Sequence, residues 1–253
     1  MKFERIDAMK AELDALRPLS ADAVKSLKTL FDIDLTYNSN AIEGSTLTYS
    51  ETKIILLDGI TIGGKSTREH LEAINHKEAI DYIEEIARRG VNGITRGDVL
   101  GLHSIILRGI DTPNAGVYRR VNVYVMQSEG QKHMFPDPVT VPQLMDGFFE
   151  WLKGPHGEHP VLFAGEAHHR LVTIHPFVDG NGRTARLLMN LILLQHGFPP
   201  AVIRMADRVR YIASLEQAER DGDRSAFDDM VMRAVEDALE TYLKTIRENI
   251  LWK

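Results

Sequence analysis

One short run of the sequence concentrates side chains that could act on a phosphate-linked group. Residues 175–186 read HPFVDGNGRTAR. His175 could accept a proton from an incoming hydroxyl, because a neutral imidazole is a base near neutral pH. Asp179 offers a carboxylate oxygen of the kind that holds Mg²⁺ already bridging phosphates. The run therefore indicates transfer of a phosphate-linked group supplied by a nucleotide.

The glycines and arginines of the same run form a candidate anion site. Gly180, Asn181 and Gly182 lie at the expected start of an apolar helix. Backbone N–H groups without partners and the positive end of the helix dipole favour an anion there. Arg183 and Arg186 are three residues apart on that helix, so both are expected to project to one side. Their forked guanidinium groups suit phosphate oxygens.

Helices are predicted to position this run, because apolar residues recur at three- and four-residue steps through most of the chain. The pattern is clearest from Phe227 to Ile246, where an apolar stripe lies opposite a charged face. The other segments are Phe3–Leu16, Ala21–Asn38, Glu69–Arg89, Thr95–Leu107, Val141–Leu152, Val161–Ile174 and Thr184–His196. The run at 175–186 is thus the loop of a helix–loop–helix.

Strand signals are confined to one segment. Val117–Gln127 alternates valines with other side chains, a turn at Ser128-Glu129-Gly130 follows, and Gln131–Phe135 completes the pattern. This arrangement is typical of a β-hairpin. The predicted fold class is therefore all-α, with one small β-hairpin.

Length, charge and composition restrict the function classes. The chain has 253 residues, a net charge of −6 and no cysteine. Disulfides, thiolate metal sites and a cysteine nucleophile are excluded, and an acidic balance disfavours nucleic acid as a partner. The charged N-terminus lacks the apolar core of a signal peptide, and the longest apolar stretch is too short to span a bilayer. We expect a cytoplasmic protein without a membrane partner.

A second run matches the sequence pattern of a phosphate-binding loop but not its structural context. Gly59–Ser66 fits the pattern GxxxxGK[ST]. Such a loop must follow a buried strand and belong to a parallel βαβ series. The segment before it opens at Thr48 with a capping box and indicates a helix. We therefore expect a turn between two helices and disfavour a P-loop ATPase with Lys65 at the phosphates.

The run at 175–186 resembles the signature of the Fic domain family, HPFx[D/E]GNGRxxR, at every fixed position. The resemblance implies a mainly helical fold with a β-hairpin flap, use of ATP, and transfer of AMP to a hydroxyl side chain of a target protein. It makes His175 the general base, Asp179 the ligand of Mg²⁺, and Gly180, Asn181 and Gly182 the anion hole.

The same resemblance assigns further nucleotide contacts. Arg183 and Arg186 would bind the distal phosphates, and Tyr211 matches a position near the nucleotide base. The phosphorylating Doc branch of the family has Lys where this chain has Gly182, so the glycine favours adenylylation.

An inhibitory element is predicted in front of the core. Ser39–Gly44 matches a second Fic pattern, [S/T]xxxE[G/N], which in this family forms an inhibitory helix. Glu43 could make a bidentate pair with Arg186 and so occupy the guanidinium meant for the nucleotide. The motifs divide the chain into residues 1–94, which carry this element together with Ser39, and residues 95–253, the catalytic core.

The hairpin at 117–135 is predicted to dock the target protein, because an edge strand can pair with an extended segment. The resemblance is also compatible with a homodimer. Two alternatives remain open beside the adenylyltransferase: a phosphodiesterase that removes AMP at the same site, and a non-catalytic nucleotide-sensing module. We do not predict a metal site at Glu166, His168 and His169. The two histidines are expected to lie at the surface or at the edge of the core.

Overall fold

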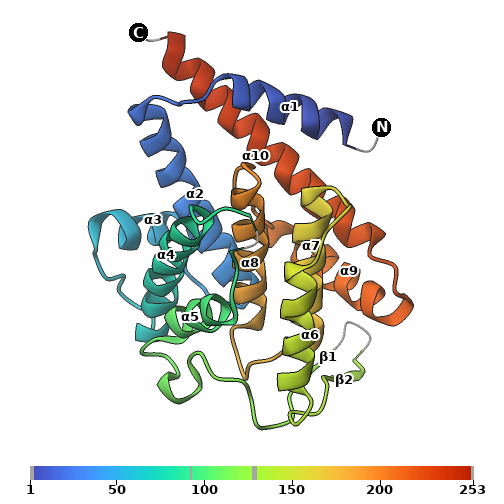
Figure 1. Cartoon of the computed structure of the whole chain (residues 1–253). Coiled ribbons are helices and arrows are strands. Elements are labelled where there is room, and N and C mark those ends of the chain that lie inside the picture. Colours follow the sequence, from blue (N-terminus) through green and yellow to red (C-terminus); the bar gives the residue numbers. More distant parts are fainter. Residues whose placement is uncertain (1–2, 92, 127–129, 252–253) are drawn as a thin grey trace.

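The computed structural model describes residues 3–91, 93–126 and 130–251, and most of this chain is helical (Figure 1). The helices are α1 (Glu4–Ala15), α2 (Ala21–Ile42), α3 (Tyr49–Asp58), α4 (Thr67–Ala87), α5 (Arg96–Leu107), α6 (Val141–Lys153), α7 (Pro160–Ile174), α8 (Asn181–Gln195), α9 (Arg208–Asp221) and α10 (Ser225–Leu251). Short 3₁₀ turns form at Thr112–Asn114 and Met205–Asp207. The prediction of a mainly helical fold is confirmed.

Helix α8 lies at the centre of the molecule, where it packs against α4, α5 and α7 (Figure 1). Every residue from Arg183 to Leu193 is buried, as expected for a helix surrounded by others. Two of these buried residues, Arg183 and Arg186, are charged. A buried charge requires partners of opposite charge or hydrogen-bond acceptors. The start of α8 is therefore where polar contacts must concentrate.

Residues on both sides of the predicted boundary at residue 94 contribute to one hydrophobic core. Ile6 of α1 and Leu27 of α2 belong to the same buried cluster as Leu188 of α8 and Leu239 of α10. Helix α1 lies along α10 at the top of Figure 1. Burial of apolar surface thus fastens the N-terminal helices to the predicted catalytic part. The division of the chain at residue 94 stays a prediction.

Helix α2 is longer than its periodicity predicts. It continues beyond Asn38 to Ile42, so that Ser39 lies in its last turn and Glu43 is its C-cap. The polar side chains of this turn have partners: Asn38 donates to the Asp34 carbonyl at 2.9 Å, and its own oxygen accepts from Met205 N at 2.9 Å. Tertiary contacts therefore extend the helix past its apolar stripe.

The β-hairpin is present but shorter than predicted. Strands β1 (Tyr124–Met126) and β2 (Lys132–Met134) are antiparallel and three residues long, with Val125 opposite His133. The expected first strand from Val117 is wrong, because this stretch turns toward the loop after α7 and Arg119 N donates to Pro176 O at 2.9 Å. The predicted turn residues Ser128 and Glu129 lie outside the described residues.

The run that resembles a phosphate-binding loop is a turn between helices, as predicted. Helix α3 ends at Gly59, whose left-handed backbone (φ 66°) suits a residue without a Cβ. Helix α4 begins after Ser66, which forms a capping box with Glu69. Lys65 Nζ donates to the Thr46 carbonyl at 2.6 Å. With a helix instead of a buried strand before it, this run lacks the framework of a P-loop.

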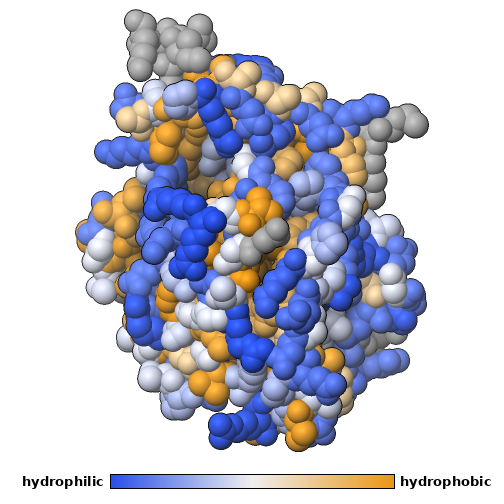
Figure 2. Space-filling model, in the orientation of Figure 1, coloured by the Kyte–Doolittle hydropathy of each residue, from blue (hydrophilic) through white to orange (hydrophobic). Residues whose placement is uncertain are grey.

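The face of the molecule shown in Figure 2 is mostly hydrophilic, with small and separated apolar areas. Scattered apolar residues of this kind are usual on a folded surface. Within residues 3–91, 93–126 and 130–251, no helix combines the length and apolarity that crossing a membrane requires.

Candidate active site

His175 is placed at the end of α7 in a form that can act as a base. It caps the helix in a left-handed conformation (φ 50°), and its Nδ1 lies 3.1 Å from the Val172 carbonyl. Since a carbonyl only accepts, Nδ1 carries the proton and Nε2 keeps its lone pair. Burial, and less strongly the charge of Arg119, lower the pKa of His175 from 6.5 to about 4. The imidazole is therefore neutral near neutral pH.

The loop after His175 is closed by its own side chains. The Asn181 amide accepts from Phe177 N and donates to Phe177 O, both at 2.9 Å. Gly180 (φ 78°) precedes α8 as its N-cap. A Cβ at this glycine would lie 3.3 Å from the His103 ring. Asn181, predicted to belong to the anion hole, thus uses its side chain to shape the loop.

His103 of α5 supports this loop, and no sequence pattern indicated this role. Its Nδ1 accepts from Gly116 N at 2.9 Å, so Nε2 is the protonated nitrogen and donates to the Asp179 carbonyl at 2.9 Å. The ring stacks on Phe177 with centroids 3.6 Å apart. Burial lowers the pKa of His103 to about 4 and keeps this neutral tautomer.

Arg119 is a second residue that sequence reasoning missed. It is buried, and its guanidinium donates to three backbone carbonyls: His175 at 2.7 Å, Pro136 at 2.6 Å and Val121 at 3.1 Å. These bonds connect the segment before the hairpin, the segment after it and the loop that begins at His175. Phe135, just after β2, stacks on the His175 ring with centroids 3.7 Å apart.

Asp179 and Arg183 belong to a closed ring of four charges. Arg68 of α4 contacts Asp179 at 2.7 Å and Glu72 at 3.0 Å, and Arg183 contacts Glu72 at 3.2 Å and Asp179 at 3.4 Å. Burial works to raise the pKa of Asp179, but Arg183, the Gly180 N–H and Arg68 together hold it below its ordinary value. The carboxylate is therefore ionised.

Arg186 faces the segment that the sequence predicts to be inhibitory. Its Nη2 donates to Glu43 Oε1 at 2.6 Å and to the Ser39 carbonyl at 2.9 Å, and its Nε donates to Ser39 Oγ at 3.0 Å. The predicted Glu43–Arg186 pair is present, but the predicted bidentate geometry is wrong. Ser39 lies one turn before Glu43 on α2 and takes the donors that a second carboxylate oxygen would need. Arg183 and Arg186 thus face different partners.

A cavity of about 440 Å³ lies beside His175 and Arg186, whereas Asp179 and Arg183 are not among its lining residues. Its lining includes five predicted site residues, namely Glu43, His175, Gly182, Arg186 and Tyr211. Val125, Met126, His133 and Phe135 contribute the wall on the side of the hairpin. A Cβ on Gly182 would collide with the Glu43 carboxylate and lie 3.0 Å from Arg186 Nη1. Glycine at this position therefore lets the glutamate reach the arginine.

Tyr211 contributes its hydroxyl as well as its ring. The buried hydroxyl accepts from Arg186 Nη1 at 3.3 Å and lies 2.8 Å from His168 Nε2. The expectation that His168 is a surface or core-edge residue is wrong, because its side chain is completely buried. Periodicity alone did not indicate this contact, since His168 and Tyr211 come from different helices.

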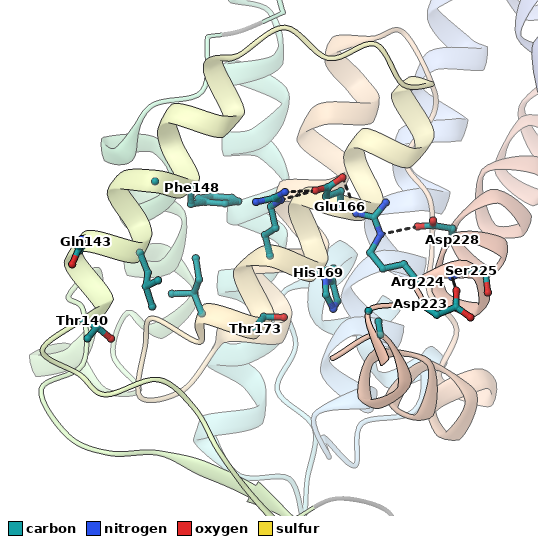
Figure 3. A pocket seen from close by; sticks show the side chains of 16 residues that line it. Thr140, Gln143, Phe148, Glu166, His169, Thr173, Asp223, Arg224, Ser225 and Asp228 are labelled. Carbon is teal, nitrogen blue, oxygen red and sulfur yellow. Dashed lines mark hydrogen bonds and ion pairs between the residues drawn. The ribbon is translucent and has the colours of Figure 1, made fainter. Parts of the chain in front are cut away.

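A larger groove of about 1300 Å³ runs beside this cavity and shares His169 and Thr173 with it. Figure 3 shows Glu166 above His169, with Arg224 next to it. Glu166 contacts Arg224 at 2.8 Å and Arg170 at 2.6 Å, so its carboxylate oxygens are paired with arginines. In residues 3–91, 93–126 and 130–251, no three His, Cys, Asp or Glu side chains form a group that could hold a metal ion.

The fold and the site together define a helical protein whose central helix begins at a glycine-rich loop, beside a neutral histidine. A sequence profile of the Fic/DOC family matches residues 93–193. The structure of Fic-1 (residues 134–508) from C. elegans is similar with a TM-score of 0.84 and 31% identity, covering 96% of this chain and 71% of that one. The chain belongs to the Fic/DOC family.

Two further relatives extend the comparison. A Fic domain containing signaling protein from Bacteroides thetaiotaomicron is similar with a TM-score of 0.89 and 28% identity, covering 97% of each chain. A protein named Protein adenylyltransferase Fic from Nematostella vectensis is 38% identical over 243 residues, which are 95% of this chain and 55% of that protein. The chain spans about half the length of the curated relatives it matches.

Proposed function

We propose that this chain transfers AMP from ATP to a hydroxyl side chain of a protein, itself included, and that Glu43 restrains the reaction. The observation that carries the proposal is the 2.6 Å contact between Glu43 and Arg186 in the wall of a cavity that His175 also lines. The relatives named as protein adenylyltransferases support the same activity.

The reaction uses the neutral form of His175. The hydroxyl oxygen of the target attacks the α-phosphorus of ATP, and its proton passes to His175 Nε2, the nitrogen with the free lone pair. The new bond joins that oxygen to the α-phosphorus, and the bond from the α-phosphorus to the bridging oxygen breaks as pyrophosphate leaves. Backbone N–H groups at the start of α8 stabilise the charge on the α-phosphate oxygens.

Asp179 is the residue that fits Mg²⁺. Its ionised carboxylate is a hard oxygen ligand, and Mg²⁺ in nucleotide sites is usually held by one or two carboxylates together with substrate phosphates. A single acidic residue is therefore enough on the protein side. When bound, the ion would neutralise negative charge on the phosphates. Arg68 must yield its 2.7 Å contact with Asp179 in that state.

The hairpin is proposed as the docking site of the target protein. Tyr124, Val125, Met126 and Met134 on its two strands are exposed apolar residues. The hairpin side of the cavity brings this surface next to His175. Pairing of an extended target segment with a strand edge would supply affinity through backbone hydrogen bonds, with little demand on sequence.

The experiment compares the native chain and Glu43→Gly, each incubated with Mg²⁺ and with ATP labelled at either the α- or the γ-phosphate. The α-label is expected to enter protein, more strongly in the variant, whereas the γ-label leaves with pyrophosphate. Incorporation of the γ-label would instead show phosphoryl transfer and would refute the proposal.

Removal of AMP from a modified protein is the second candidate, because the Glu43 carboxylate lines the same cavity as His175 and could orient a water. It predicts that the native chain releases AMP from the labelled protein and that Glu43→Gly does not. Retention of the label with the native chain would exclude this second activity.

A further inference from the structure

A buried chain of three polar side chains runs from the interior of the molecule to the nucleotide cavity. His168 Nε2 lies 2.8 Å from the Tyr211 hydroxyl, and Arg186 Nη1 donates to that hydroxyl at 3.3 Å. The three residues come from α7, α9 and α8, and all are buried. A hydrogen bond withdrawn from water in this way fixes the orientation of its members.

His168 is placed so that it can hold Tyr211 but cannot compete for anions. Its ring packs between the rings of Tyr211 and Phe227, at centroid distances of 5.7 Å and 4.9 Å. Burial, and then the charge of Arg186, lower the pKa of His168 well below its ordinary value, so the imidazole is neutral. Its Nδ1 has no hydrogen-bond partner among the described residues, so its contact with Tyr211 through Nε2 is the one that matters.

Tyr211 belongs to a different helix from the other partners of Arg186. Ser39 and Glu43 both belong to the end of α2, the inhibitory segment. Any movement that withdraws Glu43 therefore also disturbs the contacts with Ser39. Tyr211 comes from α9, outside that segment, and its hydroxyl can keep hold of Nη1 when α2 moves. The support of Arg186 should matter most when the inhibitory contact is absent.

We propose that His168 is a positioning residue, which acts through the Tyr211 hydroxyl to hold Arg186 toward the phosphates of ATP. This inference rests on the proposed function. It assigns to α7 a second task beside carrying His175: the same helix presents the base at its end and orients the phosphate-binding arginine from its middle.

The test starts from Glu43→Gly, in which the inhibitory contact is gone, and adds a matched pair of substitutions. A glutamine at position 168 can place an amide near the position of Nε2, whereas an asparagine reaches only the position of Nδ1. His168→Asn is expected to raise the KM for ATP about five- to tenfold with a smaller change in kcat, as for loss of one buried hydrogen bond. His168→Gln is expected to restore a KM within about threefold of the parent.

A double-mutant cycle with Tyr211→Phe identifies the route of the effect. If His168 acts through the hydroxyl, Tyr211→Phe alone raises KM similarly, and adding His168→Asn to it causes no further increase. Effects that multiply, or equal KM values for the Asn and Gln variants, would overturn the inference. If His168→Asn does not fold, an unchanged KM for Tyr211→Phe overturns it. A Glu43→Gly parent that binds ATP but transfers no AMP would refute the proposed function instead.

Discussion

Removal of the Glu43 carboxylate should increase the affinity for ATP by an amount that follows from its contact with Arg186. The pair is separated by 143 positions in sequence and joined at 2.6 Å. The arginine side chain is 5% exposed and the glutamate side chain 39% exposed, so solvent screens one partner. In the proposed function, ATP must displace the glutamate before its phosphates can bind the guanidinium of Arg186.

The size of the effect comes from two opposing considerations. A hydrogen bond to a charged group contributes about 1.5–3 kcal/mol when it is buried. Exposed ion pairs contribute only about 0–1 kcal/mol. Because the glutamate is partly exposed, we take the contribution of the Glu43–Arg186 contact as about 1–2 kcal/mol. Since 1.4 kcal/mol is a factor of ten, Glu43→Ala should lower the Kd about 5- to 30-fold.

The assay is isothermal titration calorimetry with Mg²⁺ and an ATP analogue that has a methylene bridge between the α- and β-phosphates and cannot release AMP. Glu219→Ala is the matched control, because Glu219 lines the same cavity but pairs with His133 at 3.0 Å. An equal gain of affinity in both variants would show that general charge, and not the contact with Arg186, limits binding. An unchanged Kd for Glu43→Ala would refute the inhibitory role of the contact.

Three further predictions concern stability and the rejected P-loop. In the folded protein His175 and His103 each have a pKa of about 4, compared with 6.5 for an ordinary histidine. As the pH falls, these two side chains therefore take up protons at a higher pH in the unfolded chain than in the folded one. The free energy of unfolding should therefore be highest above about pH 6.5 and fall toward about pH 4, by about 1.4 kcal/mol per pH unit for each histidine. Urea titrations that show no loss of stability between these pH values would contradict this prediction. Arg119→Met leaves three carbonyls without their donor and should lower the free energy of unfolding by about 3 kcal/mol, measured the same way; an unchanged urea midpoint would argue against its role. Lys65→Ala should leave the Kd for ATP unchanged. A large loss of affinity would instead support the interpretation of Gly59–Ser66 as a P-loop.

Sequence reasoning succeeded where the information is local. Twelve consecutive residues contain the histidine, the aspartate, the glycines and both arginines of the candidate site. The apolar period of 3.6 residues located most helices, because each helix must bury one face. The pairing of Glu43 with Arg186 spans distant parts of the chain and was found only because Ser39–Gly44 matches a second family pattern.

The residues that support the site could not be predicted, because their partners are backbone atoms or side chains brought together by the fold. Arg119 donates to the carbonyls of two residues far away in sequence and of one nearby residue, and His103 bonds to Asp179 O and Gly116 N. Every residue has such backbone groups, so no pattern marks them. The valine alternation before Tyr124 misled the strand assignment for a similar reason, since Arg119 in that segment contacts the loop that begins at His175 and no local pattern indicates this contact.

We propose above all that His175 acts as the base for AMP transfer and that Glu43 restrains this transfer. The most direct measurement is the intact mass of Glu43→Gly after incubation with ATP and Mg²⁺, beside the same variant with His175→Ala. We predict an added AMP on Glu43→Gly and none on the double variant. An absent adduct on Glu43→Gly, or an adduct that persists without His175, would contradict the account.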